Sequence, residues 1–179
     1  MEISYGNLRH LLCILLLIAR VGDVGTTYLV TPTLALEANP IARKLGWKFA
    51  VLTIAACLLP YWSPQVAVTA LIPFLFVSTS NAGKVWVVRT MGEQAYWAFC
   101  LDLARKSRLS RPLLGVAASS FFMVLAGGVV LFFCSSPAND WGIWIGLGVV
   151  LYGVVMGLYG ALWMVRMFRK AAVPIGQSV

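Results

Sequence analysis

Long hydrophobic runs constrain this chain more than any other feature of its sequence. Of the 179 residues, 60% are hydrophobic and 11% are charged, whereas a soluble domain has about 45–50% apolar and about 25% charged residues. A membrane-spanning helix needs about 20 apolar residues. The runs lack the alternation of strands, and a bilayer admits only helices or closed barrels. We therefore expect one all-α, polytopic membrane domain, residues 1–179, with the lipid bilayer as its main partner.

Five spans and one interfacial helix are predicted from these runs. Apolar residues between the third and fourth spans recur at i, i+3, i+4 and i+7, namely Tyr96, Phe99, Cys100 and Leu103. This spacing is typical of an amphipathic helix in the headgroup layer or, alternatively, of a partner-docking helix. The predicted spans cover residues 8–30, 40–59, 64–88, 112–134 and 141–168, and the interfacial helix covers residues 92–108.

Basic residues indicate the orientation of these spans. Lys and Arg gather in the first and third connections and after the last span, and none occurs in residues 60–63 or 135–140. The positive-inside rule then puts the N-terminus outside and the C-terminus in the cytoplasm. The net charge of +8 is explained by these loops, so we expect no nucleic-acid partner.

Glycines in the last span recur at four-residue spacing. They are Gly142 and Gly146, then Gly153 and Gly157. Small residues at this spacing let helix backbones approach closely. We expect this face to pack within the chain, against a second copy in a homo-oligomer, or against another membrane partner.

Polar residues interrupt the first span. Arg20, Asp23 and Thr27 lie at i, i+3 and i+7 and share a helix face, with Thr26 adjacent. Charges within a span are costly and usually face the bundle interior or a watery cavity. The simplest interpretation is that Arg20 and Asp23 satisfy each other; the alternative is a functional site.

Three polar side chains are expected at similar depth. Asp23 lies roughly 10 Å from the cytoplasmic end of its span, at about 1.5 Å per residue. Asn81 lies similarly far from the end of the third span, with Ser78 one turn earlier, and Lys48 lies about two turns into the second. We expect Asp23, Lys48 and Asn81 to meet near the cytoplasmic face.

A Glu-x-Asn-Pro segment precedes the second span. Asn39 suits a helix N-cap, Pro40 suits the first helical position, and Glu37 places a negative charge near the positive helix start. The alternative is that Glu37 and Asn39 line the same polar pocket as Asp23.

The combined pattern resembles a family of small prokaryotic membrane proteins catalogued only as a domain of unknown function. That family combines Asp-x-x-x-Thr, Glu-x-Asn-Pro, a Lys and a late Asn, and the resemblance covers about residues 10–90. It implies a shared site and a multi-pass protein of the prokaryotic cytoplasmic (inner) membrane, but no activity. The matching residues are Asp23, Thr27, Glu37, Asn39, Pro40, Lys48 and Asn81.

These observations lead to three hypotheses about function. We expect an ion or small polar ligand to be bound or transported at Asp23, Thr27, Glu37, Asn39, Lys48 and Asn81, supported by Arg20, Thr26, Pro40 and Ser78. The alternatives are an accessory subunit of a membrane complex, or a hydrolase using the carboxylates of Asp23 and Glu37. No catalytic residue or cofactor is assigned, and the question of a bound metal stays open. His10 lies at the far end of the first span, which argues against histidine chemistry.

Overall fold

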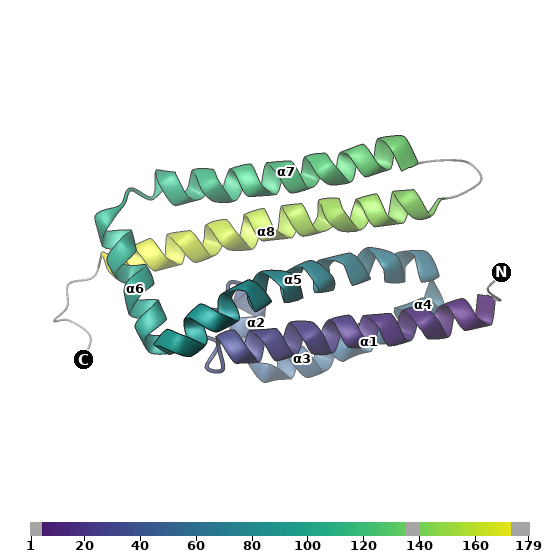
Figure 1. The fold of residues 1–179 in the computed structure, drawn as a ribbon, viewed down its shortest axis with the longest axis horizontal. Coiled ribbons are helices and arrows are strands. Elements are labelled where there is room, and N and C mark those ends of the chain that lie inside the picture. The colour runs from purple at the N-terminus through teal and green to yellow at the C-terminus, as the bar shows by residue number, and fades with distance from the viewer. Residues whose placement is uncertain (1–4, 135–139, 173–179) are drawn as a thin grey trace.

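The computed structural model describes residues 5–134 and 140–172, and all regular elements within these ranges are helices. Four of them are long and apolar enough to cross a membrane. They are α1 (Tyr5–Val30), α5 (Pro64–Met91), α7 (Ser110–Cys134) and α8 (Trp141–Ala171). Figure 1 shows them side by side, with α1 packed on α5, α5 on α8, and α8 on α7. The all-helical prediction is confirmed, and these four helices match predicted spans to within a few residues.

The region predicted as a second long helix, residues 40–59, is broken into short pieces. The chain forms α2 (Pro40–Leu45), α3 (Trp47–Thr53), a 3-10 helix η1 (Ile54–Leu58) and α4 (Leu59–Trp62). Gly46 separates α2 from α3 with φ of 62°, a conformation that favours glycine. Pro60 has no N–H to donate to Ala56 four residues earlier, and Leu59 donates to that carbonyl instead. The expectation of one continuous helix is corrected for these reasons.

The broken segment nevertheless runs antiparallel along α1 (Figure 1). At its start, Trp47 lies against Tyr28 near the end of α1, with ring centroids 5.6 Å apart. At its finish, the hydroxyl of Tyr61 lies 2.9 Å from Nδ1 of His10, near the beginning of α1. The segment therefore returns along most of the length of α1.

The glycine face of α8 packs against α7 in the same chain. A Cβ added to Gly127 of α7 would lie 2.8 Å from the Gly146 carbonyl oxygen, so the two backbones are in direct contact. The positions of Gly142, Gly153 and Gly157 are likewise closed by α7 side chains or backbone. The predicted close packing is confirmed within the chain.

The amphipathic helix α6 (Glu93–Lys106) closes one end of the bundle. It lies across the ends of α5 and α8, at the opposite end of the molecule from the start of α1 (Figure 1). Its apolar face contributes Cys100 and Ala104 to a buried cluster with Met167 and Ala171 of α8. The amphipathic pattern thus predicted the helix correctly, and its apolar face is partly covered by α8.

Candidate functional site

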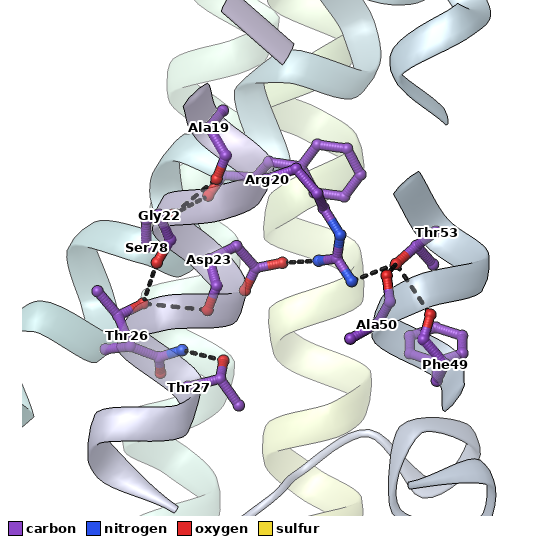
Figure 2. A network of polar contacts seen from close by, with 12 residues as sticks. Ala19, Arg20, Gly22, Asp23, Thr26, Thr27, Phe49, Ala50, Thr53 and Ser78 are labelled. Atoms are coloured by element: carbon purple, nitrogen blue, oxygen red, sulfur yellow. Dashed lines mark hydrogen bonds and ion pairs between the residues drawn. The ribbon is translucent and has the colours of Figure 1, made fainter. Parts of the chain in front are cut away.

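A buried ion pair lies at the centre of the polar constellation. Arg20 and Asp23, one turn apart in α1, are 6% and 8% exposed, and the guanidinium donates to the Asp23 carboxylate. Arg20 also donates to the hydroxyl of Thr53 in α3. Its guanidinium lies over the Phe74 ring of α5, 5.2 Å from the ring centroid. Figure 2 shows the side chain of Arg20 reaching from α1 to Thr53 with Asp23 beside it.

The local geometry explains why this pair tolerates burial. Thr53 donates its own hydroxyl proton to backbone carbonyls of α3, which leaves its oxygen lone pairs to accept from Arg20. Arg20 Nε is buried and has no hydrogen-bond partner among the described residues, while the face of its guanidinium is stacked on Phe74. The predicted mutual satisfaction of Arg20 and Asp23 is confirmed, and it extends over three helices.

Small and hydroxyl side chains bring α1 and α5 together around this pair. Ser78 donates to the Phe74 carbonyl at 2.8 Å and lies 3.3 Å from the Ala19 carbonyl across the interface. A Cβ on Gly22 would lie 3.3 Å from the Ser78 Oγ, so the glycine permits this approach. Thr26 donates its hydroxyl proton to the Gly22 carbonyl at 2.8 Å, so this hydrogen bond stays within α1. These residues support the packing.

Asn81 contacts α1 at Thr27 rather than at Asp23, the residue expected at its depth. Its Nδ2 donates to Thr27 Oγ1 over 3.0 Å, one turn beyond Asp23. Two of the predicted site residues, Thr27 and Asn81, are therefore in direct contact, next to the Asp23 pair.

The Glu-x-Asn-Pro segment caps α2. Asn39 Oδ1 accepts from the Ile41 and Ala42 amides at 2.9 and 3.3 Å, and Pro40 is the first helical residue. The Glu37 carboxylate accepts from the Asn39 amide at 2.7 Å. The capping interpretation is thereby confirmed for all three residues of the motif.

Lys48 does not join the site. It is exposed on α3, because the break at Gly46 resets the helix before Lys48, and Thr53 is the α3 residue that faces Arg20 and Asp23. The expected convergence of Lys48 with Asp23 and Asn81 is corrected.

Lys84 supplies a cation that the sequence interpretation missed. It follows Asn81 by one turn in α5 and is exposed. Among the described residues, however, neither Glu37 nor Lys84 forms an ion pair. The position of Lys84, three residues after Asn81 within an apolar run, was the available signal.

Glu93 is a second residue whose role was missed. Its carboxylate accepts from the Thr31 hydroxyl and, at 3.3 Å each, from the amides of Thr33 and Ala35. These bonds hold the connection between α1 and α2, in which Leu34 has a φ of 59°. The apolar spacing that predicts α6 gives no sign of these contacts of Glu93. Its actual partners lie about 60 residues earlier in the chain.

Among the described residues, no three His, Cys, Asp or Glu side chains lie close enough together to hold a metal ion. Comparisons with models of protein families, with curated proteins and with solved structures found no match. The family resemblance inferred from the motif therefore stays a prediction.

Proposed function

We propose that the chain is an integral protein of a prokaryotic inner membrane that crosses the bilayer five times, with its N-terminus outside. The four long apolar helices support four crossings, and the return of residues 47–62 along α1 supports the fifth. The basic residues at the ends of α5, α6 and α8 lie at one end of the bundle, as expected for a cytoplasmic face. Labelling of single engineered cysteines in whole cells tests this orientation: a reagent that cannot cross the membrane should label position 6 but not position 108.

We further propose that Glu37, Lys84 and Asn81 bind an ion or small polar ligand near that face. One observation supports this most directly: Asn81 of α5 donates to Thr27 of α1 beside the Arg20–Asp23 pair, while neither Glu37 nor Lys84 forms an ion pair among the described residues. A carboxylate and an ammonium group that are not paired within the described residues can each bind a group of opposite charge, and Asn81 lies one turn before Lys84 on α5. Since Arg20 neutralises Asp23, the role proposed for Asp23 is to position α1 and Thr27.

Ligand-dependent stabilisation of the purified, full-length chain in detergent tests this function. The probes are sodium, potassium and magnesium chlorides and glycine, each at several concentrations, and the readout is the midpoint of thermal unfolding. A ligand that binds only the folded state raises this midpoint. We expect at least one probe to stabilise the chain, and Glu37→Gln and Lys84→Gln to lose that response.

Lys48→Gln is the matched control, because Lys48 is an exposed lysine outside the site. It should respond to the probe as the unmodified chain does. The proposal fails if Glu37→Gln and Lys84→Gln respond as strongly as Lys48→Gln, or if none of the probes stabilises the chain.

An accessory role in a membrane complex is the second candidate. The observation that favours it is the link that Arg20 makes among α1, α3 and α5 through Asp23, Thr53 and Phe74, because such a network holds helices together without a ligand. This role predicts that Asp23→Asn lowers the yield of folded chain and of any co-purified partner, while leaving the response to probes intact. The alternative of a hydrolase has no comparable observation in its favour, because Asp23 is bound by Arg20.

A further inference from the structure

A cavity of about 400 Å³ lies between the start of α2 and the end of α8. Four of the seven residues that line it are basic. Arg43 comes from α2, and Arg166, Arg169 and Lys170 come from the last turns of α8, while Pro40 and Leu162 add apolar surface.

Within residues 5–134 and 140–172, no acidic side chain forms an ion pair with the basic residues around this cavity. The ion pairs in the described residues are Arg20 with Asp23 and Lys106 with Asp102, and neither includes a residue of the cavity. Arg43 and Arg166 line the same cavity from two different helices. Like charges gathered around one space favour occupation by an anion.

Arg166 is held in place before any anion binds. Its Nη1 donates to the Glu37 carbonyl at 3.5 Å, and its guanidinium lies over the Trp97 ring of α6, 5.6 Å from the centroid. The Lys170 ammonium lies against the same ring at 5.7 Å. Side chains that are already ordered lose less conformational entropy on binding. An arginine has five N–H donors in a planar fork that matches phosphate geometry.

The cavity also lies at the level where phosphate groups occur in a membrane. α8 has 31 residues and is about 46 Å long at 1.5 Å per residue, which exceeds the hydrocarbon thickness of about 30 Å. Its last turns therefore extend to the headgroup layer. The nearby pair of Trp97 and Trp163, with ring centroids 6.3 Å apart, is typical of a membrane interface.

We propose that this cavity binds a phosphate group, carried either by the headgroup of an anionic phospholipid or by a soluble phosphate compound. Basic pockets between membrane helices are known to suit phospholipid headgroups. Leu162 and Pro40 would contact the apolar part of a lipid next to its phosphate. The inference does not depend on the ligand site proposed above, because Glu37, Lys84 and Asn81 do not line the cavity.

Binding of short-chain phosphatidylglycerol to the full-length chain in neutral detergent tests the lipid source, with short-chain phosphatidylcholine as the uncharged comparison. The test variant is Arg43→Gln with Arg169→Gln, because both side chains are exposed and their loss should not disturb folding. At about 1 kcal/mol for each basic residue near a membrane surface, losing two should weaken phosphatidylglycerol binding about 10- to 30-fold. Phosphatidylcholine should bind weakly to all variants.

The matched control is Arg89→Gln with Arg108→Gln, which removes the same charge from exposed positions at the same end of the bundle but outside the cavity. It should retain phosphatidylglycerol binding within about twofold. An equal loss in both double variants would mean nonspecific attraction and would overturn the proposal, as would equal binding of the two lipids.

The soluble source is tested by the shift in thermal unfolding with inorganic phosphate, against sodium chloride of equal ionic strength. A phosphate-specific shift that disappears in Arg43→Gln with Arg169→Gln, but persists in the control, supports the site with a soluble ligand. If phosphatidylglycerol alone gives the cavity-dependent response, the phosphate group belongs to a lipid. If neither probe gives one, the proposal is wrong.

Discussion

Arg20 forms an ion pair with Asp23 one turn later in α1, and both residues are more than nine-tenths buried. Asp23→Asn keeps the shape of the side chain but leaves the Arg20 guanidinium buried without a counter-charge. Breaking a buried pair in this way costs about 3–5 kcal/mol. We expect a loss of this size in the free energy of unfolding, measured in mixed detergent micelles.

Asp102→Asn is the matched control for this prediction. Asp102 pairs with Lys106 across one turn of α6, but both side chains are more than half exposed, so its loss should cost only about 0.5 kcal/mol. Adding Arg20→Gln to Asp23→Asn should recover part of the lost stability, because it removes the unpaired charge. Equal stability of the Asp23→Asn and Asp102→Asn variants would contradict the structural role assigned to the pair.

Gly127 and Gly128 are neighbours on α7 with opposite surroundings. A Cβ on Gly127 would lie 2.8 Å from both the Gly146 oxygen and the Val150 nitrogen, and these backbone atoms can yield only if α7 and α8 separate. Gly127→Ala should therefore destabilise the chain by about 1–3 kcal/mol, as overpacking does.

Gly128→Ala provides the control on the same helix. Nothing lies within 4 Å of a Cβ at this position, and alanine favours a helix over glycine by about 1 kcal/mol. Measured in the same unfolding assay, Gly128→Ala should be neutral or stabilising. If both alanine variants had the same effect, the close packing of α7 on α8 would be wrong.

The parts of the fold that the sequence predicted are those governed by local chemistry. Apolar runs gave the long helices, helical spacing placed Arg20 beside Asp23, and the residue types at Asn39 and Pro40 gave the start of α2. Each of these depends on residues only a few positions apart.

The missed features depend on contacts between distant segments. Whether Gly46 would adopt a positive φ and turn Lys48 outward could not be seen in an apolar run. Glu93 binds a loop that only the folded chain brings near it. The polar contacts of α1 with α5 could therefore be predicted by region, but the position of Lys48 away from them could not.

Glu93 should control the order of the connection between α1 and α2. Glu93→Ala removes the acceptor for the Thr31 hydroxyl and the amides of Thr33 and Ala35. A hydrogen bond to a charged group contributes about 1.5–3 kcal/mol, so hydrogen exchange at residues 33 and 35 should become roughly tenfold faster or more. The neighbouring exposed Gln94→Ala should leave this exchange unchanged. Unchanged exchange in Glu93→Ala would show that the loop is ordered by other contacts.

Cys100 should react slowly with thiol reagents at neutral pH. Burial against α8 raises the pKa of its thiol, which outweighs the opposing effects of Tyr96 and Lys84. The thiolate is the reactive form, so a folded-state pKa above the ordinary value means less thiolate at any pH below it. In variants that retain a single cysteine, maleimide should therefore modify Cys100 at least about tenfold more slowly at pH 7.5 than the exposed Cys134. The rate of Cys100 modification should still be rising at a pH where the rate of an ordinary thiol has reached its plateau. The raised pKa also predicts that the free energy of unfolding falls as the pH rises above the pKa of this thiol in the unfolded state. Equal rates for the two cysteines would contradict the packing of α6 on α8.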